Sequence, residues 1–310
     1  MNKKGKKIIV ILGQTATGKT DLSIKIALWL NSENAQKEFN IKGAEIVSAD
    51  SRQVYKGMDI GTGKITKKEM KNIPHHLLNI ASPKRKFTIA KYQKLAYKSI
   101  DKILKKEKIP ILVGGSPFYI YSIIENWNFP KVKPDWQLRK KLEKKTTNEL
   151  FETLKKIDPQ RAKTIDKNNK RRLIRAIEIS RALGKVPKLN KNSKYNFLLI
   201  GITKEKNELK ILIDKRLKKR FKQGMIKEVE NLNKSGVSWK QLEEFGLEYK
   251  WIAKYLQGKI TKKEMVENLQ KDIEKFAKRQ MTWFKRDKKI KWVENYSEAK
   301  NIIKTFLLGK

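Results

Sequence analysis

Short runs of apolar, mostly β-branched residues recur in the first 125 residues and alternate with longer amphipathic segments. KKIIVIL (6–12), AEIVSAD (44–50) and IPILVGG (109–115) are each typical of a buried strand that ends in Gly, Ser or Asp. Helices are predicted over 21–30 and 89–106. This alternation predicts an α/β fold with a mostly parallel sheet that is covered by helices on both faces.

The pattern changes in the middle of the chain, where charged helical segments occur without any strand signal. Gly184 followed by Pro187 is a typical stop for the helix that includes 173–183. The run YNFLLIGIT (195–203) then predicts another strand, and the tail is helical with a possible short strand at 290–293. We therefore predict an α/β core made of residues 1–128 and 195–310, interrupted by an α-helical insertion domain over 129–194.

The segment GQTATGKT directly follows the first predicted strand and matches the phosphate-binding pattern G-x-x-x-x-G-K-T. Its glycines allow backbone N–H groups to point at phosphate oxygens, Lys19 adds a cation, and Thr20 can bind Mg²⁺ or a phosphate oxygen. The predicted phosphate site comprises Gly13, Gln14, Thr15, Ala16, Thr17, Gly18, Lys19 and Thr20. Because parallel strands end at one edge of a sheet, we expect this loop, Asp50 and 114–116 to line the same rim.

Asp50, after the second predicted strand, has three interpretations: a Mg²⁺ ligand, a general base or a helix N-cap. The metal interpretation is weakened because Ser48 and Ala49 separate it from the apolar run. Gly114 and Gly115 indicate either the close approach of another backbone or a ligand, or a tight strand-to-helix turn.

Two further groups of residues have both a structural and a functional interpretation. We interpret His75–His76 as structural, because adjacent residues do not share a helix face and no third metal ligand is apparent. KRQMTWFKRD (278–287) interleaves Trp283 and Phe284 with cations, which is typical of base stacking and equally of a core-facing aromatic on a basic helix.

The net charge of the chain indicates which class of partner it binds. Lys and Arg total 74 against 32 acidic residues, a net charge of +42 that suits a polyanion such as nucleic acid. Residues 131–194 hold 21 Lys or Arg and 7 Asp or Glu, a net +14 (21 minus 7). An AT-rich genome, which favours Lys, Asn and Ile codons, is an alternative source of this charge.

The other compositional signals exclude several classes of protein. The chain has no cysteine, which rules out disulfides, thiolate catalysis and cysteine-ligated zinc and fits a cytoplasmic protein. No apolar stretch is long enough for a membrane span. The basic N-terminus leads straight into the phosphate loop, so we expect no signal peptide, since cleavage there would destroy the loop.

The set and order of motifs resemble the tRNA dimethylallyltransferases, also called tRNA isopentenyltransferases, of bacterial type. The resemblance extends from about Ile8 to Arg286. The motifs that carry it are GQTATGKT, VSADSRQVYKGMDIGT, PHHLLNI, ILVGGSPFYI, NKRRLIRAIEI, RFKQGM and KRQMTWFKR. It implies a P-loop NTPase-like core and transfer of a dimethylallyl group from dimethylallyl diphosphate to N6 of the adenosine 3′ to the anticodon of tRNA.

The resemblance also implies roles for individual residues. Asp50 matches the general base, while Lys19, Thr20 and Arg220 match residues that stabilise the departing diphosphate, with Mg²⁺ as cofactor and Thr20 as a candidate ligand. The residues that match tRNA contacts are Asp50, Ser51, Arg52, Gln53, Ser116, Arg139, Arg171, Arg172, Arg175, Arg279 and Gln280. We expect the partners to be dimethylallyl diphosphate and the anticodon stem-loop of tRNA, with no membrane, and the protein to be a monomer.

The sequence departs from the family pattern in three places. Ser116 stands where Thr is usual, Pro117 where Gly is common, and FGLEYK (245–250) where a G-Y-K/R segment is usual. The C-terminal zinc finger of eukaryotic relatives is absent. The alternative functions are an ATP-dependent small-molecule kinase, which would explain only the loop region, and a non-catalytic RNA-binding protein, which the intact loop argues against.

Overall fold

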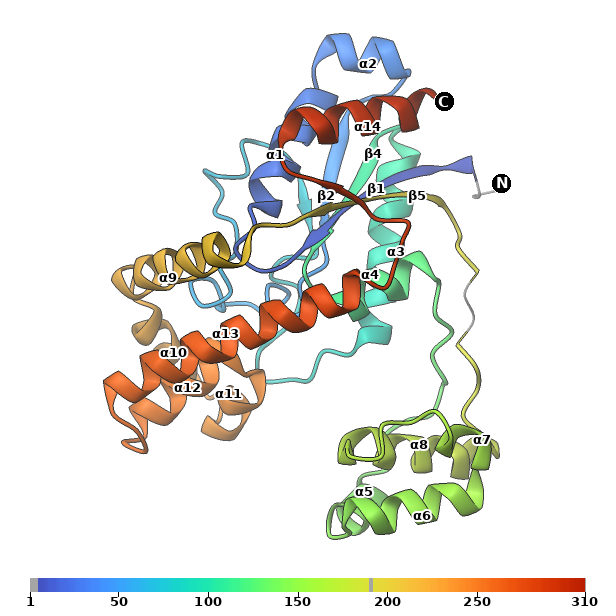
Figure 1. Ribbon diagram of the computed structural model, residues 1–310, viewed down its shortest axis with the longest axis vertical. Helices are drawn as coiled ribbons and strands as arrows, with labels where there is room; N and C mark the ends of the chain where they lie inside the picture. Colours follow the sequence, from blue (N-terminus) through green and yellow to red (C-terminus); the bar gives the residue numbers. More distant parts are fainter. Residues whose placement is uncertain (1–4, 190–191, 310) are drawn as a thin grey trace. The chain divides into compact units, whose positions relative to one another are not determined.

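The computed structural model describes residues 5–189 and 192–309 (Figure 1). Residues 1–4, with which the basic N-terminal segment begins, residues 190–191 of the predicted insertion and Lys310 lie outside this range. The chain divides into two compact units. Residues up to Glu125 and from Ser193 onward form the first, and Asn126–Asn192 forms the second.

The first unit is built on a parallel sheet. Within the described residues it has six strands in the order β3-β2-β4-β1-β5-β6. The strands are β1 (Lys7–Gly13), β2 (Ala44–Ser48), β3 (His75–His76), β4 (Ile109–Gly114), β5 (Asn196–Ile202) and β6 (Lys291–Val293). In the central strand β1, Ile9 pairs with Ile111 of β4 on one side and with Leu198 of β5 on the other. The predicted α/β class with a mostly parallel sheet is therefore confirmed.

Helices cover both faces of the sheet because its central strand is apolar on both sides. Ile9 and Ile11 of β1 pack with Leu22 of α1 and Ile303 of α14 in one buried cluster. Helix α3 packs on β2 and β4, with α4 beside it, on the other face (Figure 1). The bounds are α1 (Lys19–Leu30), α2 (Glu33–Phe39), α3 (Ile89–Lys105), α4 (Pro117–Ile124) and α14 (Tyr296–Leu308).

A helical layer follows β5 and reaches the loop after β1. Its helices are α9 (Lys206–Lys222), α10 (Met225–Lys234), α11 (Trp239–Phe245), α12 (Leu247–Leu256) and α13 (Lys262–Phe284). The longest of these, α13, starts with a capping box in which Thr261 and Glu264 satisfy each other's backbone N–H groups. Apolar residues on one side of α13, Met265, Leu269 and Ile273, are buried. No helix in the described ranges is both long and apolar enough to cross a membrane.

The second unit is entirely helical within its described residues. It consists of α5 (Trp136–Glu143), α6 (Thr147–Ile157), α7 (Pro159–Ala162) and α8 (Lys170–Leu183). Its core is formed by leucines of α5, α6 and α8, among them Leu142, Leu150 and Leu173. The predicted helix stop is confirmed, since α8 ends at Leu183 and Gly184 follows with a φ of 79°.

The end of β4 lies in direct contact with the residue that follows β2. The Ala49 amide donates to the Val113 carbonyl at 2.7 Å. A Cβ at Gly114 would collide with the carbonyl oxygen and the Cβ of Ala49. Of the two interpretations of this glycine, the structure shows the close approach of another backbone.

This contact predicts that Gly114→Ala destabilises the first unit. Because the obstacle is backbone at the end of a buried strand, we expect a loss of about 3 kcal/mol, at the high end for overpacking. Urea unfolding followed by tryptophan fluorescence measures it. The matched control is Gly5→Ala, where nothing lies within 4 Å of the added Cβ. Equal unfolding midpoints for Gly114→Ala and the wild type would contradict the steric argument.

Candidate active site

The phosphate loop has the backbone that its sequence predicts. It leaves β1 at Gly13 and enters α1 at Lys19, with Ala16 at φ 63° and Gly18 at φ 87°. A Cβ at Gly13 would collide with the Ile202 carbonyl of β5, so glycine is required there. The Lys19 ammonium folds back onto the Gln14 carbonyl of its own loop. The loop is thus closed around its lysine, ahead of the N-terminus of a 12-residue helix.

A single amide side chain from α13 ties this loop to the end of β4. Gln280 Oε1 accepts from the Thr15 amide at 2.8 Å, and its Nε2 donates to the Gly115 carbonyl at 2.6 Å. A second link runs in the opposite sense, from Gln14 Nε2 to the Ala277 carbonyl at 3.1 Å. Gln280 is 3% exposed, so its amide lies in the interior. Sequence reasoning placed Gln280 among the tRNA contacts, whereas its geometry is that of a link between loops.

Asp50 opens a turn at the same rim. Both of its hydrogen bonds use Oδ1, which accepts from the amides of Arg52 at 2.8 Å and Gln53 at 3.2 Å. No helix begins at this turn in the described part of the chain, so Oδ1 of Asp50 stabilises a turn and is not a helix N-cap, and no described residue donates a hydrogen bond to Oδ2. Next to it, the Ser116 hydroxyl accepts from the Ser51 amide at 3.1 Å and meets the Ser51 hydroxyl at 3.3 Å. The segments after β1, β2 and β4 thus lie at one rim, as predicted.

The residues that depart from the family pattern fit this rim. Pro117 is the first residue of α4, where its fixed φ and missing N–H are favourable. The segment FGLEYK passes from α11 to α12 through Gly246, which has a φ of 76°. Its Phe245 carbonyl accepts from Arg52 Nε at 2.9 Å. This holds the guanidinium of Arg52, which was predicted to contact tRNA, above the Phe245 ring.

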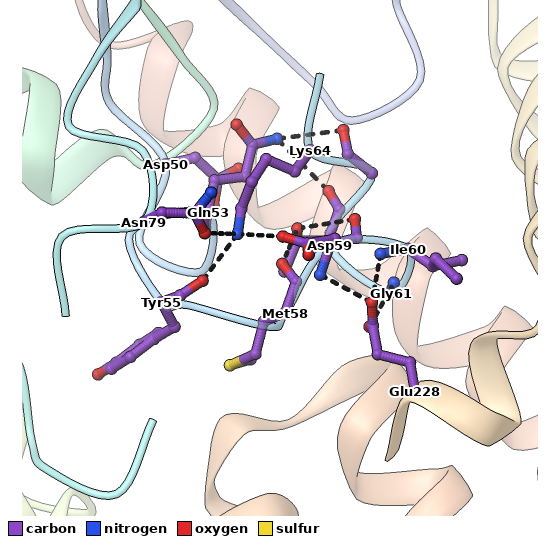
Figure 2. Close-up of polar contacts among 12 residues, drawn as sticks. Asp50, Gln53, Tyr55, Met58, Asp59, Ile60, Gly61, Lys64, Asn79 and Glu228 are labelled. Atoms are coloured by element: carbon purple, nitrogen blue, oxygen red, sulfur yellow. Dashed lines mark hydrogen bonds and ion pairs between the residues drawn. The ribbon is translucent and has the colours of Figure 1, made fainter. Parts of the chain in front are cut away.

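A buried lysine organises the long loop that follows Asp50 (Figure 2). Lys64 is 9% exposed, and its ammonium donates to the Tyr55 carbonyl, Asp59 Oδ1 and Asn79 Oδ1 at 2.5–2.7 Å. Three donors and three acceptors satisfy this charge in the interior. Gln53, another predicted tRNA contact, donates from Nε2 toward the Gly63 carbonyl at 3.3 Å.

A carboxylate from α10 fixes the same loop from the other side. Glu228 accepts hydrogen bonds from the amides of Asp59, Ile60 and Gly61 at 2.6–3.0 Å (Figure 2). It also accepts one from the Tyr249 hydroxyl of α12 at 2.8 Å. Three successive N–H groups on one carboxylate form a strong charge-assisted site. The loop is therefore anchored to α10 and α12.

Two arginines of α9 reach the phosphate loop, and sequence reasoning identified only one of them. Arg220, the predicted diphosphate ligand, donates from Nη1 to Glu248 Oε1 at 2.8 Å and to the Gly61 carbonyl at 3.0 Å. Arg216, one helical turn earlier, donates a long hydrogen bond to Thr15 Oγ1 at 3.4 Å and has no ion pair with a described residue. Arg216 therefore brings an unneutralised cation to the loop. Its i, i+4 spacing from Arg220 places both on one face of α9, but the same spacing recurs among the lysines of that helix and does not single out Arg216.

The crowding of cations changes their protonation. Burial, with the neighbouring Arg216 charge, lowers the pKa of Lys19 to about 7, and the Asp50 charge opposes this. Burial and Arg220 lower the pKa of Arg216 to about 10. An anion bound at the loop would reverse both effects, because it favours the charged forms.

The predicted tRNA-binding arginines of the second unit fall into two groups. Arg139 and Arg175 both donate to Glu178, which is 2% exposed, and Arg139 does so with two nitrogens at 2.7–2.9 Å. Arg171 and Arg172 are exposed at the start of α8, as Arg279 is on α13. The first group neutralises a buried carboxylate, whereas the second is exposed, with Arg172 Nη1 4.0 Å from Asp166 Oδ2 at the surface.

The histidine pair is structural in its contacts. His76 Nε2 lies 2.7 Å from Glu45 Oε2, and His75 Nδ1 lies 2.7 Å from the Ile73 carbonyl. Across the described ranges, no group of three His, Asp or Glu side chains could hold a metal ion.

The fold and the rim define a class, a P-loop α/β protein with an all-helical second unit. The chain belongs to the IPP transferase family, whose model matches residues 53–287. It is 38% identical to a tRNA dimethylallyltransferase of Alkaliphilus oremlandii over 97% of this chain and 96% of that protein. A protein of the same name from Acetivibrio thermocellus is 40% identical, over 96% and 95%.

Solved structures agree with this family. A tRNA isopentenylpyrophosphate transferase from Bacillus halodurans is 34% identical, covers 99% of this chain and 96% of its own, and has a TM-score of 0.71. The predicted P-loop NTPase-like fold class and the predicted family are thus confirmed. The extent of the match favours the transferase over the kinase and the non-catalytic binding protein.

The low pKa of Lys19 predicts that anion binding takes up a proton. Below pH 7 the ammonium is already charged, so no uptake is expected. At pH 8 the free lysine is mostly neutral, and binding inorganic diphosphate should return close to one proton, with affinity falling as the pH rises. Calorimetry of diphosphate binding in buffers of different ionisation enthalpy measures the uptake.

The control is Lys19→Arg, whose side chain stays charged throughout this range. The protonation of diphosphate itself is common to both proteins and cancels in the comparison. Equal uptake by the two proteins at pH 8 would show that Lys19 is already charged in the free protein.

Proposed function

We propose that this protein transfers the dimethylallyl group of dimethylallyl diphosphate to N6 of the adenosine 3′ to the anticodon in tRNA. The observation that carries the proposal is the near full-length similarity to tRNA dimethylallyltransferases. The rim supports it, because a phosphate loop, a carboxylate and an unneutralised arginine meet there. We also propose that it acts as a monomer in the cytoplasm.

The proposed reaction needs stabilisation of the leaving diphosphate and removal of a proton from N6, and different residues provide each. As the carbon–oxygen bond of the donor breaks, negative charge develops on the leaving diphosphate. Backbone N–H groups of the loop, Lys19 and Arg216 are arranged to stabilise it. The exocyclic amine of adenine is a weak nucleophile, since its lone pair is delocalised into the ring. A base that accepts the N6 proton as the new carbon–nitrogen bond forms therefore lowers the barrier, and Asp50 Oδ2 is the oxygen left for it.

Mg²⁺ fits this site as an ion shared with the substrate. Thr20, exposed at the start of α1, is the residue that would hold it, with diphosphate oxygens and water completing the coordination. The metal would supply charge neutralisation for the leaving group.

The direct test uses labelled dimethylallyl diphosphate, Mg²⁺ and tRNA, followed by nuclease digestion and identification of the modified nucleoside. We expect N6-dimethylallyl adenosine at the position 3′ to the anticodon. ATP hydrolysis in proportion to product would instead support a kinase-like reaction, and tight tRNA binding without transfer would support a binding protein.

We predict that Asp50→Asn lowers kcat by about 10²–10⁴-fold. Asparagine retains an oxygen for the amides of Arg52 and Gln53, so the turn should persist while the base is lost. Affinity for tRNA should change less than about tenfold, or 1.4 kcal/mol. The matched control is Asp135→Asn, because Asp135 caps α5 through the Leu138 amide. Turnover of Asp50→Asn close to that of the control would rule out the base.

We predict that the exposed arginines of α8 contribute to tRNA affinity through counterion release. Replacing Arg171 and Arg172 with Gln should reduce the slope of log affinity against log salt by about 1.5–2. Diphosphate binding should stay unchanged. The control replaces Lys155 and Lys156, two exposed cations of α6, with Gln. If both pairs change the slope equally, the contact is not specific to α8.

A further inference from the structure

The long segment between β2 and β3 has Asp50 near its start. Residues 49–74 all lie in the described part of the chain, and none of them belongs to a helix or a strand. Such a segment takes its position from side-chain contacts rather than from a regular hydrogen-bond ladder. The contacts at its tip, which we define as residues 59–61, therefore bear on where Asp50 lies.

Glu228 on α10 binds this tip with both of its carboxylate oxygens. Oε2 accepts from the amides of Asp59 and Ile60 at 2.8 and 2.6 Å, and Oε1 accepts from the Gly61 amide at 3.0 Å (Figure 2). The Tyr249 hydroxyl also donates to Oε1, at 2.8 Å. Each oxygen thus receives two donors, an arrangement that suits a carboxylate because it only accepts. A side-chain amide in its place would direct an NH₂ group at a backbone N–H or at the hydroxyl.

One path of hydrogen bonds leads from the tip back to Asp50. The backbone turns directly after the tip, where the Gly63 amide donates to the Ile60 carbonyl at 3.0 Å. The Gln53 side chain reaches this turn, with Nε2 3.3 Å from the Gly63 carbonyl. The Gln53 amide in turn donates to Asp50 Oδ1 at 3.2 Å. Gln53 therefore connects the tip to the Asp50 turn through both its side chain and its backbone.

A second path runs through the buried Lys64. Its ammonium joins Asp59 Oδ1 to the Tyr55 carbonyl, at 2.5 and 2.7 Å (Figure 2). The Tyr55 amide donates to the Arg52 carbonyl at 3.1 Å, and the Arg52 amide is the other donor to Asp50 Oδ1, at 2.8 Å. Two separate paths therefore run from the tip to the same carboxylate oxygen.

We propose that Glu228 is a positioning residue, which sets the place of Asp50 at the rim by holding the tip of this segment on α10. The proposal rests on the proposed function, because Asp50 is a base only in that reaction. A base must lie within hydrogen-bond reach of the proton that it accepts, and a misplacement of about 1 Å can lower a rate about 10²-fold. Loss of the Glu228 carboxylate should therefore lower turnover and leave the binding of both substrates largely intact.

The test is a double-mutant cycle between Glu228→Gln and Asp50→Asn, measured as prenyl transfer from dimethylallyl diphosphate to tRNA with Mg²⁺. Glu228→Gln alone should lower kcat by about 10–10²-fold, with both KM values changed less than about threefold. In the Asp50→Asn background it should lower kcat by less than about threefold more, because no base is left to be positioned.

The matched control is Glu230→Gln on the same helix. Glu230 pairs with Lys227 and Lys234 at the surface, so its loss changes the charge of α10 equally without touching the tip. Its kcat should equal that of the wild type. A general loss of structure in Glu228→Gln would lower kcat by the same factor in both backgrounds, and the cycle distinguishes that from positioning.

Two outcomes would overturn the proposal. The first is a kcat of Glu228→Gln equal to that of the wild type. The second is an equal factor in both backgrounds, which would mean that Glu228 acts by another route, such as the Gly61 carbonyl that accepts from Arg220 Nη1 at 3.0 Å. If Glu228→Gln does not fold, Glu228→Asp, which keeps the charge on a shorter side chain, takes its place under the same criteria.

Hydrogen–deuterium exchange separates this result from the proposed function. The amides of Arg52 and Gln53, which Asp50 Oδ1 holds, should exchange at least about tenfold faster in Glu228→Gln than in the wild type or in Glu230→Gln. Unchanged exchange at both amides would overturn the proposal whatever the kinetics. If the wild-type protein transfers no prenyl group, the proposed function is rejected, and exchange at these amides still decides whether Glu228 holds the Asp50 turn.

Discussion

The amide of Gln280 is the contact on which the geometry of the rim depends. It satisfies a donor of the phosphate loop and an acceptor after β4 at once, and Gln14 returns a bond to the same helix. Neutral amide groups are well suited to this task, since a charged side chain at 3% exposure would add a desolvation penalty. These hydrogen bonds join α13 to the phosphate loop after β1 and to Gly115 after β4. They therefore couple the positions of the backbone segments around the phosphate site.

Holding cations together is the second constraint on the site. Lys19 and two arginines lie within reach of one loop, and burial makes their mutual repulsion costly. The structure lowers this cost in three ways. One cation is paired with Glu248, Lys19 has a pKa low enough to lose its proton, and Asp50 contributes a nearby negative charge. The nearby carboxylates therefore moderate the attraction of this site for anions.

Sequence patterns predicted the parts of this arrangement that depend on local chemistry. Apolar runs followed by glycine or aspartate identified β1, β2 and β4, and the spacing of Gly13, Gly18 and Lys19 identified the loop. Parallel strand order then implied a shared rim. The contacts that α9 and α13 make with the phosphate loop could not be predicted from the sequence. Lys and Arg occur throughout both helices, and a pattern of charge does not reveal which cation is buried. Arg216 was missed for this reason.

Because the sequence does not show which cations are buried, four arginines of the second unit were all predicted to contact tRNA. Arg139, Arg171, Arg172 and Arg175 look alike in a basic sequence, yet two of them surround the buried Glu178. Removing either of those would leave a carboxylate short of partners in the interior, so a loss of RNA binding there would not distinguish contact from stability. Positive charge therefore has two separate roles in this protein. Buried guanidinium groups pair with buried carboxylates and so stabilise the local fold. Exposed guanidinium groups can contact phosphates. Burial, rather than residue type, decides which role a given arginine has.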